Sequence, residues 1–258
     1  MIPNITLGNK TISAYMIMTL IGIFAAGCFS ISRFKKEEDK MELLVALLWS
    51  GVGLLAGGHL LYAITNIEGI INSIKNGDGF FRILMLYFSG NVFYGGLIGS
   101  YIAFLIYFGI KKKDIHRYID EGALFIPFFH MFGRIGCFLS GCCYGAESEI
   151  GFVYKYSMIE AANGVCRFPV QLVEALGNLL IFALMYYLYK RGVLRYRLIY
   201  LYFIIYPILR FVLEYFRGDT YRGFLFSLST SQLISIPVFI YGAVMLAITC
   251  VRNRKQTE

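Results

Sequence analysis

The stretch His130-Met-Phe-Gly-Arg-Ile-Gly-Cys-Phe-Leu-Ser-Gly-Cys-Cys-Tyr-Gly145 places an arginine, four glycines and three cysteines in a run otherwise apolar enough to cross a membrane. An arginine near the bilayer centre costs about 2.5–3.5 kcal/mol to insert, so Arg134 must face a partner or a wet cavity. The glycines remove side chains where a backbone or a ligand comes close. Small-residue helix packing also explains glycines, but it does not explain Arg134. The stretch therefore predicts a polar site within a membrane-spanning helix.

The composition indicates an integral membrane protein. Hydrophobic residues make up 58% of the 258 residues and charged residues only 16%, which a soluble core could not hide. The formal charge of +8 lies mostly in short loops between apolar runs, so it reports topology rather than a nucleic-acid partner. The first apolar run has spanning length and no basic segment before it, so we expect it to remain as a span.

Apolar runs of about 20 residues predict an all-α polytopic protein with seven membrane-spanning helices. They lie at 12–32, 43–65, 84–110, 118–139, 170–189, 198–216 and 230–251. Lysine and arginine alternate between the connections, with fifteen on one face and seven on the other. The positive-inside rule then places the N-terminus outside and the C-terminus inside. We expect a single domain, 1–258, with the outer segments 66–82 and 144–168 over the site.

This orientation collects the costly polar residues of separate spans at one depth. They are Arg134 with the glycines after it, Arg167, Gln171 and Glu174 at the start of the fifth span, and Arg210, Glu214 and Arg217 on one face of the sixth. A shared polar cavity near the outer leaflet explains this gathering. Two narrower interpretations stay open. Glu214 can be a structural partner of Arg210 or Arg217, and Gln171 can simply bond backbone across helices.

The sequence blocks around these residues resemble one known family. Gly133-Arg-Ile-Gly-Cys-Phe-Leu-Ser-Gly-Cys-Cys-Tyr-Gly145 is similar to the signature of prolipoprotein diacylglyceryl transferases, Gly-Arg-x-Gly-Asn-Phe-x-Asn-Gly-Glu-x-x-Gly. Further matching blocks follow the family's order: Asn91-Val-Phe-Tyr-Gly-Gly-Leu-Ile-Gly99, Arg167-Phe-Pro-Val-Gln-Leu-Val-Glu174, Arg210-Phe-Val-Leu-Glu-Tyr-Phe-Arg217 with Asp219, and Ser231-Gln-Leu-Ile-Ser-Ile-Pro237. The chain is identified as a divergent member with a cysteine-rich signature.

The resemblance implies a transferase of lipoprotein biosynthesis in the bacterial cytoplasmic membrane. Its substrates would be phosphatidylglycerol, which gives up its diacylglyceryl group, and a prolipoprotein, whose cysteine thiol receives it with release of glycerol phosphate. On the matching positions, Arg134 and Arg210 would clamp the lipid phosphate. Glu214 would orient an arginine or take a proton. We expect membrane lipids as surroundings, no nucleic-acid partner, no cofactor and no metal.

The predicted catalytic residues are Tyr94, Arg134, Arg210, Glu214 and Cys142. The predicted substrate-binding residues are Tyr15, His130, Arg134, Cys137, Gly141, Gly145, Arg167, Gln171, Glu174 and Arg217. Four positions depart from the family pattern: Tyr94 stands at its histidine, Cys137 and Ser140 at its two asparagines, and Cys142 at its glutamate. A phenol is a poor general base compared with an imidazole, so His130 or Glu174 is an alternative base.

The cysteines leave several functions open. Within a phospholipid-dependent transferase, whose acceptor can differ from the family's, Cys142 or Cys143 can be a nucleophile or a packing residue. In a second class, a thiol-redox membrane protein, Cys137, Cys142, Cys143 and Cys166 exchange disulfides. In a third class, a metal-binding or non-catalytic lipid-binding protein, His130, Cys137, Cys142 and Cys143 are possible soft ligands. The spacing lacks a C-x2-C pair, and a helical chain would point residues 142 and 143 apart, which disfavours a metal.

Overall fold

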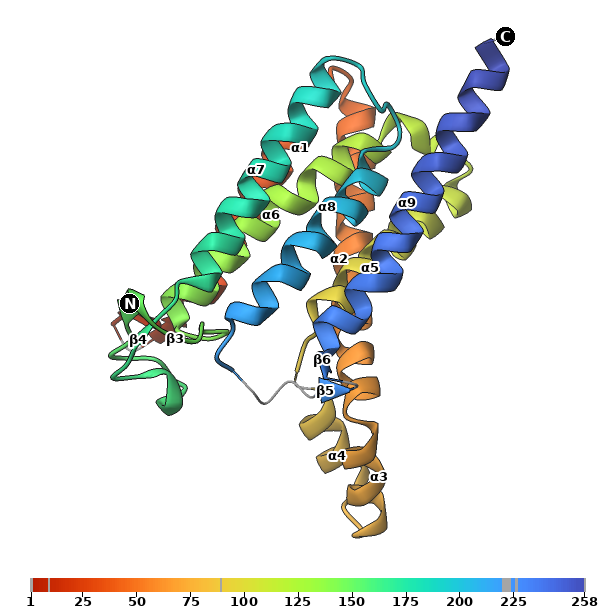
Figure 1. Ribbon diagram of the computed structural model, residues 1–258. Coiled ribbons are helices and arrows are strands. Elements are labelled where there is room, and N and C mark those ends of the chain that lie inside the picture. Colours follow the sequence, from red (N-terminus) through yellow and green to blue (C-terminus); the bar gives the residue numbers. More distant parts are fainter. Residues whose placement is uncertain (1, 9, 89, 220–223, 226, 258) are drawn as a thin grey trace. The chain divides into compact units, whose positions relative to one another are not determined.

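The computed structural model describes residues 2–8, 10–88, 90–219, 224–225 and 227–257. The chain packs as two compact units, residues 1–33 with 119–258 and residues 34–118 (Figure 1). Each unit has its own internal helix packing and is described by itself. The single seven-helix domain expected from the sequence stays a prediction.

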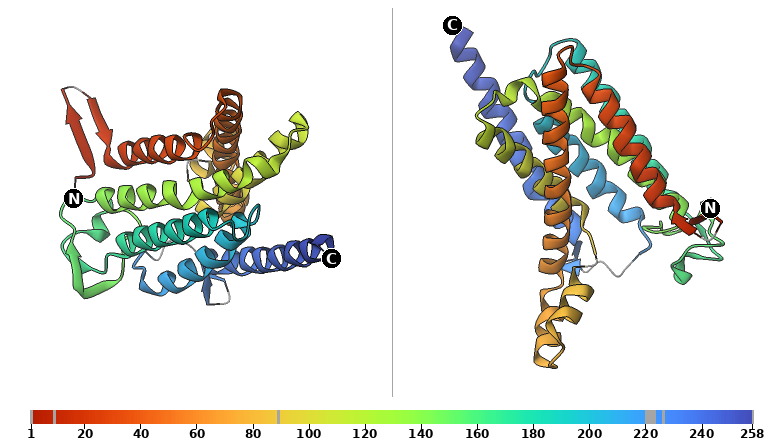
Figure 2. Two further views of the ribbon diagram at one scale, coloured as in Figure 1. Left: turned by 90° about the horizontal axis from the view of Figure 1, so that it is seen from above. Right: turned by 180° about the vertical axis from the view of Figure 1, so that it is seen from behind.

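The first unit is a helical assembly of five long helices. They are α1 (Ala14–Ile31), α6 (Ile119–Ser140), α7 (Val170–Lys190), α8 (Leu198–Leu213) and α9 (Thr230–Thr257). Helix α6 packs against α1 on one side and against α7 and α8 on the other, and α8 packs against α9 (Figure 2). The 3-10 turn η3 (Glu214–Phe216) continues α8. Helices distant in the sequence thereby bring their polar residues together.

Short antiparallel strand pairs adjoin the ends of these helices. The pair β1 (Asn4–Leu7) and β2 (Lys10–Ser13) leads directly into α1. The pair β3 (Glu147–Val153) and β4 (Cys166–Arg167), with the 3-10 turn η2 (Glu160–Ala162) between them, joins α6 to α7. The pair β5 (Phe224–Leu225) and β6 (Leu228–Ser229) precedes α9. These connections all fall on the side that the sequence predicts to be outside.

The second unit is built on one close helix pair. Its elements are α2 (Glu37–Thr65), α3 (Ile67–Lys75), α4 (Phe80–Tyr87), α5 (Phe93–Lys111) and the 3-10 turn η1 (Ile115–Arg117). Helices α2 and α5 approach closely at their glycines. A Cβ added to Gly57 would lie only 2.3 Å from the Gly95 carbonyl oxygen, so a larger residue would not fit there. Such small-residue contacts are typical of helix pairs in membranes.

The predicted all-α fold with seven membrane-spanning helices is confirmed for the described residues. Seven helices are long and apolar enough to cross a membrane: Ala14–Ile31, Glu37–Thr65, Phe93–Lys111, Ile119–Ser140, Val170–Lys190, Leu198–Phe216 and Thr230–Arg252. Large apolar side chains such as Phe24 and Leu48 are exposed on their surfaces, as a lipid environment permits.

The start of the third span was predicted wrongly at 84. Helix α4 ends at Tyr87 and the spanning helix α5 begins only at Phe93. Gly90 and Val92, which lie between these helices, bond to α2 instead. The His59 ring nitrogen Nδ1 lies 2.7 Å from the Gly90 carbonyl oxygen, and the Val92 N–H donates to the Gly58 carbonyl at 3.1 Å. An apolar run alone does not show such a break.

Candidate active site

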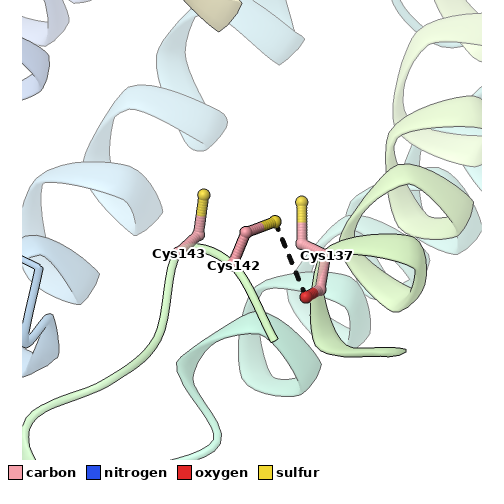
Figure 3. A group of neighbouring side chains, drawn as sticks. All are labelled: Cys137, Cys142 and Cys143. Carbon is pink, nitrogen blue, oxygen red and sulfur yellow. Dashed lines mark hydrogen bonds between the residues drawn. The ribbon is translucent and has the colours of Figure 1, made fainter. Parts of the chain in front are cut away.

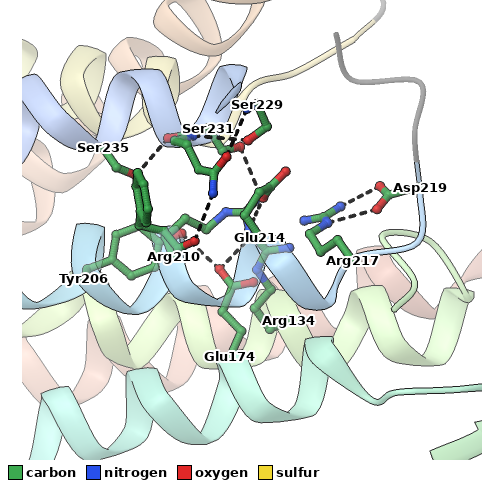
Figure 4. A network of polar contacts seen from close by, with 12 residues as sticks. Arg134, Glu174, Tyr206, Arg210, Glu214, Arg217, Asp219, Ser229, Ser231 and Ser235 are labelled. Atoms are coloured by element: carbon green, nitrogen blue, oxygen red, sulfur yellow. Dashed lines mark hydrogen bonds and ion pairs between the residues drawn. The ribbon is translucent and has the colours of Figure 1, made fainter. Parts of the chain in front are cut away.

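A buried ion pair joins α6 to α7 at the centre of the first unit (Figure 4). Arg134 Nη2 lies 3.0 Å from Glu174 Oε1, and the hydroxyl of Tyr206 on α8 donates to the same oxygen at 3.0 Å. Glu174 and Tyr206 are almost fully buried. A carboxylate that holds an arginine and accepts a second hydrogen bond fixes the guanidinium plane, which is what planar recognition of a ligand needs.

His130 belongs to the same cluster but does not present a free base. Arg134 Nε donates to His130 Nε2 at 3.3 Å, and His130 Nδ1 lies 3.3 Å from the Tyr202 hydroxyl. An arginine can only donate, so Nε2 accepts and the ring proton lies on Nδ1. His130 therefore contacts Arg134 through Nε2, and its role as an alternative base stays a prediction.

Two further arginine–carboxylate pairs lie in the same polar region. Arg210 Nη1 contacts Glu214 Oε2 at 2.6 Å, one turn along the chain, and its Nη2 donates to Ser231 Oγ of α9 at 3.0 Å. Arg217 donates two hydrogen bonds to Asp219, from Nε to Oδ1 at 2.9 Å and from Nη2 to Oδ2 at 2.6 Å. Glu214 thus pairs with Arg210 rather than with Arg217.

The arrangement places three guanidinium groups against three carboxylates in one water-poor region (Figure 4). Among the described residues, Arg134, Arg210 and Arg217 each form an ion pair with one carboxylate. Among the described residues, the contacts of Arg134 use Nε and Nη2 and leave Nη1 for a ligand. Arginines preorganised in this way suit an anion such as a phosphate.

Three thiols gather at the end of α6 and form what we name the thiol cluster: Cys137 in its last turn, and Cys142 and Cys143 in the loop that follows. Their Sγ atoms all lie within 4.8 Å of one another (Figure 3). Helix α6 ends at Ser140, and the next residues include two in the left-handed region, Gly141 at φ 73° and Cys143 at φ 55°. The sequence-based argument that a helical chain would point residues 142 and 143 apart does not apply, because the chain there is not helical.

The thiols of this cluster influence one another's ionisation. Hydrogen bonds with Cys137 and Cys142 hold the pKa of the Cys143 thiol well below its ordinary value, and Arg217 and Arg134 lower it further. The hydrogen bond to Cys137 also lowers the pKa of Cys142, but its bond to Cys143 and its burial together raise that pKa to about 12. Cys142, the predicted nucleophile, is thus the less acidic of the two neighbours.

The family is decided by comparison with known proteins. The family model described as prolipoprotein diacylglyceryl transferase matches residues 4–248. The chain belongs to this family. It is 33% identical to the phosphatidylglycerol–prolipoprotein diacylglyceryl transferase of Clostridium tetani over 95% of each chain. It is 30% identical to the phosphatidylglycerol–prolipoprotein diacylglyceryl transferase 2 of Clostridium perfringens, over 95% of this chain and 94% of that one.

Members of the prolipoprotein diacylglyceryl transferase family are transferases, so the protein is a multi-pass membrane transferase. The predictions of family, enzyme class and fold made from the sequence are confirmed. The roles of the individual residues stay predictions. By their contacts, the predicted site residues fall into two groups. Some lie in the ion network or the thiol cluster, and others shape the loop between α6 and α7.

Gln171 and Gly141 belong to the loop-shaping group. Gln171 Nε2 donates to the Cys142 carbonyl at 2.8 Å, and its Oε1 accepts from the Tyr154 hydroxyl at 3.2 Å. The Ser157 hydroxyl donates to the Gly141 carbonyl at 3.0 Å. Gln171 therefore bonds backbone, as one of the two open interpretations held, and through that bond it positions the thiol cluster.

Arg167 and Gly145 hold the next part of the same loop. Arg167 donates to the carbonyls of Ala162 at 3.1 Å and Gly145 at 3.4 Å, and its guanidinium lies 4.5 Å from the centre of the Tyr144 ring. A Cβ added to Gly145 would lie 2.1 Å from the Phe168 carbonyl oxygen, so no larger residue fits. These contacts give both residues a structural part in the loop.

Two predicted tyrosines lie in different units. Tyr15 lies in the first turn of α1. Its Cα lies 3.2 Å from the position of a Cβ added to Gly136, which places Tyr15 close to Cys137. Its side chain is 45% exposed, so a ligand can reach it. Tyr94 is buried in the first turn of α5, in the second unit. Its catalytic role stays a prediction.

Sequence reasoning missed Tyr206, Ser231 and Asp219 as site residues. Tyr206 precedes Arg210 by four residues on α8, so helical spacing could have placed it on the same face as that arginine. Asp219 lies two residues after its partner Arg217 and was noted only as part of a motif. Ser231 comes from α9, and no local pattern links it to Arg210.

Proposed function

We propose that the protein transfers the diacylglyceryl group of phosphatidylglycerol to the cysteine thiol of a prolipoprotein at the outer face of the bacterial cytoplasmic membrane. The observation that carries the proposal is the set of three buried guanidinium groups held by three carboxylates among α6, α7 and α8. The curated relatives from Clostridium, whose names state phosphatidylglycerol and prolipoprotein, supply the substrate class.

The arginines suit the leaving group of this reaction. As the carbon–oxygen bond between the glyceryl group and the phosphate breaks, negative charge grows on the phosphate oxygen. Donors fixed in a water-poor site stabilise that charge more than water can, because they need no reorganisation. Arg134, which Glu174 and His130 hold in place, and Arg210, which Glu214 and Ser231 hold, are the donors we assign to the lipid phosphate.

The acceptor thiol must lose its proton before it attacks. Glu174 and Glu214 both hold arginines, and His130 Nε2 accepts from Arg134. On the basis of these contacts we assign the two carboxylates and the imidazole as positioning groups for the arginines. Among the described residues of this unit, the thiol cluster is a further reactive group close to the arginines.

A reconstituted assay tests the proposed function. Purified protein in phosphatidylglycerol vesicles receives a peptide with a lipobox cysteine, and both glycerol phosphate release and the peptide mass are followed. We expect equal amounts of glycerol phosphate and diacylglyceryl peptide, and neither with a serine-substituted peptide. Transfer that proceeds from vesicles of phosphatidylethanolamine but not of phosphatidylglycerol would contradict the proposed donor. No modified peptide with any phospholipid would contradict the acceptor.

The proposed outer-face site also predicts a membrane orientation. A cysteine placed at Lys112 should react with a membrane-impermeant maleimide only from the cytoplasm, because its loop carries the larger basic charge. A cysteine placed at Lys155, in the connection between α6 and α7, should react only from outside. The opposite labelling pattern would move the thiol cluster and the arginines to the inner leaflet.

A further inference from the structure

The thiol cluster has the ligand set of a metal site. Cys137 comes from the last turn of α6 and Cys142 and Cys143 from the loop after it, and their three Sγ atoms lie within 4.8 Å of one another (Figure 3). Sulfur ligands about 2.3 Å from a tetrahedral zinc ion lie about 3.8 Å apart. The three sulfurs therefore need to move inward by no more than about 1 Å to share one ion.

The loop is shaped so that neighbouring cysteines converge. Gly141 and Cys143 both have left-handed backbone, at φ 73° and φ 55°, and a cysteine adopts that conformation only when its surroundings impose it. Successive residues of a helix or strand point apart, whereas in Figure 3 the Cys142 and Cys143 side chains extend to the same side as Cys137.

Contacts from three other segments hold this loop in place. The Cys142 carbonyl accepts from Gln171 of α7 at 2.8 Å, and the Gly141 carbonyl accepts from Ser157 at 3.0 Å. Farther along, the Ala146 N–H donates to the Phe216 carbonyl at 2.9 Å. The loop is thus fixed independently of any disulfide, and the described cysteines are free thiols. Preorganised ligands of this kind are a property of functional sites rather than of packing.

Two cations flank the cluster and offset its negative charge. Arg134 precedes Cys137 by three residues on α6, so the two lie on one helix face. Arg217 pairs with Gly145 through a backbone bridge that places it at the other side of the loop. Three thiolates and one divalent ion carry a net charge of minus one, which the nearby Arg134 and Arg217 side chains favour, although each of them also pairs with a carboxylate.

We propose that Cys137, Cys142 and Cys143 bind one thiophilic divalent cation, zinc by its preference for thiolates, and leave its fourth position to the acceptor thiol. This inference rests on the proposed function and departs from the sequence-based expectation of no metal. Sites with three protein ligands and one open position are the catalytic kind of zinc site. Cys142 and Tyr94 stand where the family's signature has its glutamate and histidine. The metal site would take over the base function that this chain lacks at those positions.

The chemistry balances without a further reagent. Binding to the ion deprotonates the acceptor thiol and releases its proton to solvent. The bound sulfur attacks the glyceryl carbon, a carbon–sulfur bond forms, and the carbon–oxygen bond to the phosphate breaks. The electron pair of that bond leaves with glycerol phosphate, which Arg134 and Arg210 stabilise. The thioether product carries no charge and is a weak ligand, so it leaves the ion.

Cobalt binding tests the site without any lipid. Metal-free, reduced protein is titrated with Co²⁺, whose visible spectrum reports tetrahedral thiolate coordination. We expect one Co²⁺ per chain, displaced by one Zn²⁺, and loss of the spectrum in Cys142→Ala. The matched control Cys166→Ser, a cysteine of β4 outside the thiol cluster, should keep it. No tetrahedral spectrum in the wild type, or an unchanged spectrum in Cys142→Ala, would overturn the site.

Peptide addition and transfer assays test the open position. A lipobox peptide should shift the cobalt spectrum, and its serine analogue should not. Metal-free protein should transfer at least about tenfold more slowly than the same protein restored with zinc. Full transfer by metal-free protein would overturn the inference while the proposed function stands. A peptide-responsive metal site without transfer from any phospholipid would support the site and remove the proposed function.

Discussion

The two ends of α6 each carry an arginine–glutamate pair at the same distance, and their surroundings differ. At the start of α6, Glu121 pairs with Arg33 at 3.0 Å, and near its end Arg134 pairs with Glu174 at 3.0 Å. Arg33 lies over aromatic rings, 4.6 Å from the centre of Tyr189. Arg134 instead lies among hydrogen-bonding side chains and beside two further ion pairs.

This difference separates a structural ion pair from one built for a ligand. Rings around Arg33 stabilise its charge by cation–π contact. The polar groups around Arg134 fix its orientation and leave one nitrogen for an anion. A buried arginine is therefore informative about function only once its neighbours are known.

The strongest way to break this comparison is to remove the carboxylates. Glu174→Gln leaves Arg134 buried without a counter-charge and should lower the free energy of unfolding by about 3–5 kcal/mol. Glu121→Gln should lower it by less than half as much, because rings and partial solvent exposure still support Arg33. Denaturation of both variants in detergent micelles, followed by circular dichroism, measures the difference. An equal or larger loss in Glu121→Gln would make the two pairs alike.

Charge-conserving substitutions compare the two arginines in catalysis. Arg134→Lys should lower kcat/KM for diacylglyceryl transfer by about 100-fold, since an ammonium cannot reproduce the forked contact with a phosphate. Arg33→Lys should stay within about threefold of the wild type. Vesicle assays with both proteins at matched folded concentration provide the test. Near-normal transfer by Arg134→Lys would make Arg134 a structural partner of Glu174.

Substitution of two glycines near the thiol cluster tests how strongly the loop after α6 depends on its left-handed turn. Gly141→Ala places a Cβ in left-handed backbone, 2.6 Å from Ser157 Cβ, and should cost about 2 kcal/mol of stability. Gly133→Ala, in the helix with no atom within 4 Å of the new Cβ, should be neutral or stabilise by up to about 1 kcal/mol. Thermal unfolding in micelles compares them. Similar stability in both variants would mean that the loop does not need its left-handed turn.

The smallest expected effect comes from single hydroxyl groups. Tyr206→Phe removes the 3.0 Å hydrogen bond to Glu174 and should cost about 1 kcal/mol of stability. Because an energy of that size changes a rate by less than tenfold, the rate of transfer should fall by less than tenfold. Tyr186→Phe removes only a 3.4 Å contact with Arg33 and should cost less than about 0.5 kcal/mol. Paired unfolding curves decide the order. A greater loss in Tyr186→Phe would contradict the assignment of the ordered polar network to the Arg134 end.

The membrane-spanning plan could be predicted from the sequence because the bilayer imposes it locally. Each span needs about 20 apolar residues whatever its neighbours are, and six of the seven predicted spans overlap the observed helices closely. The exception begins at Phe93 because residues 90–92 bond to α2. Partners distant in the sequence caused that break, and hydropathy does not register them.

The sequence by itself determined the family, the seven apolar helices and the residues that are costly in lipid, since these follow from composition, motif order and the expense of buried charge. Only the tertiary structure decided that Arg134 pairs with Glu174 of α7 and that Glu214 pairs with Arg210, one of its two local candidates. It also decided that Cys142 and Cys143 converge on Cys137. The physical reason is that contacts from α7 supply the partner of Arg134 and hold the loop with its left-handed turn, and such contacts have no local signature in the chain.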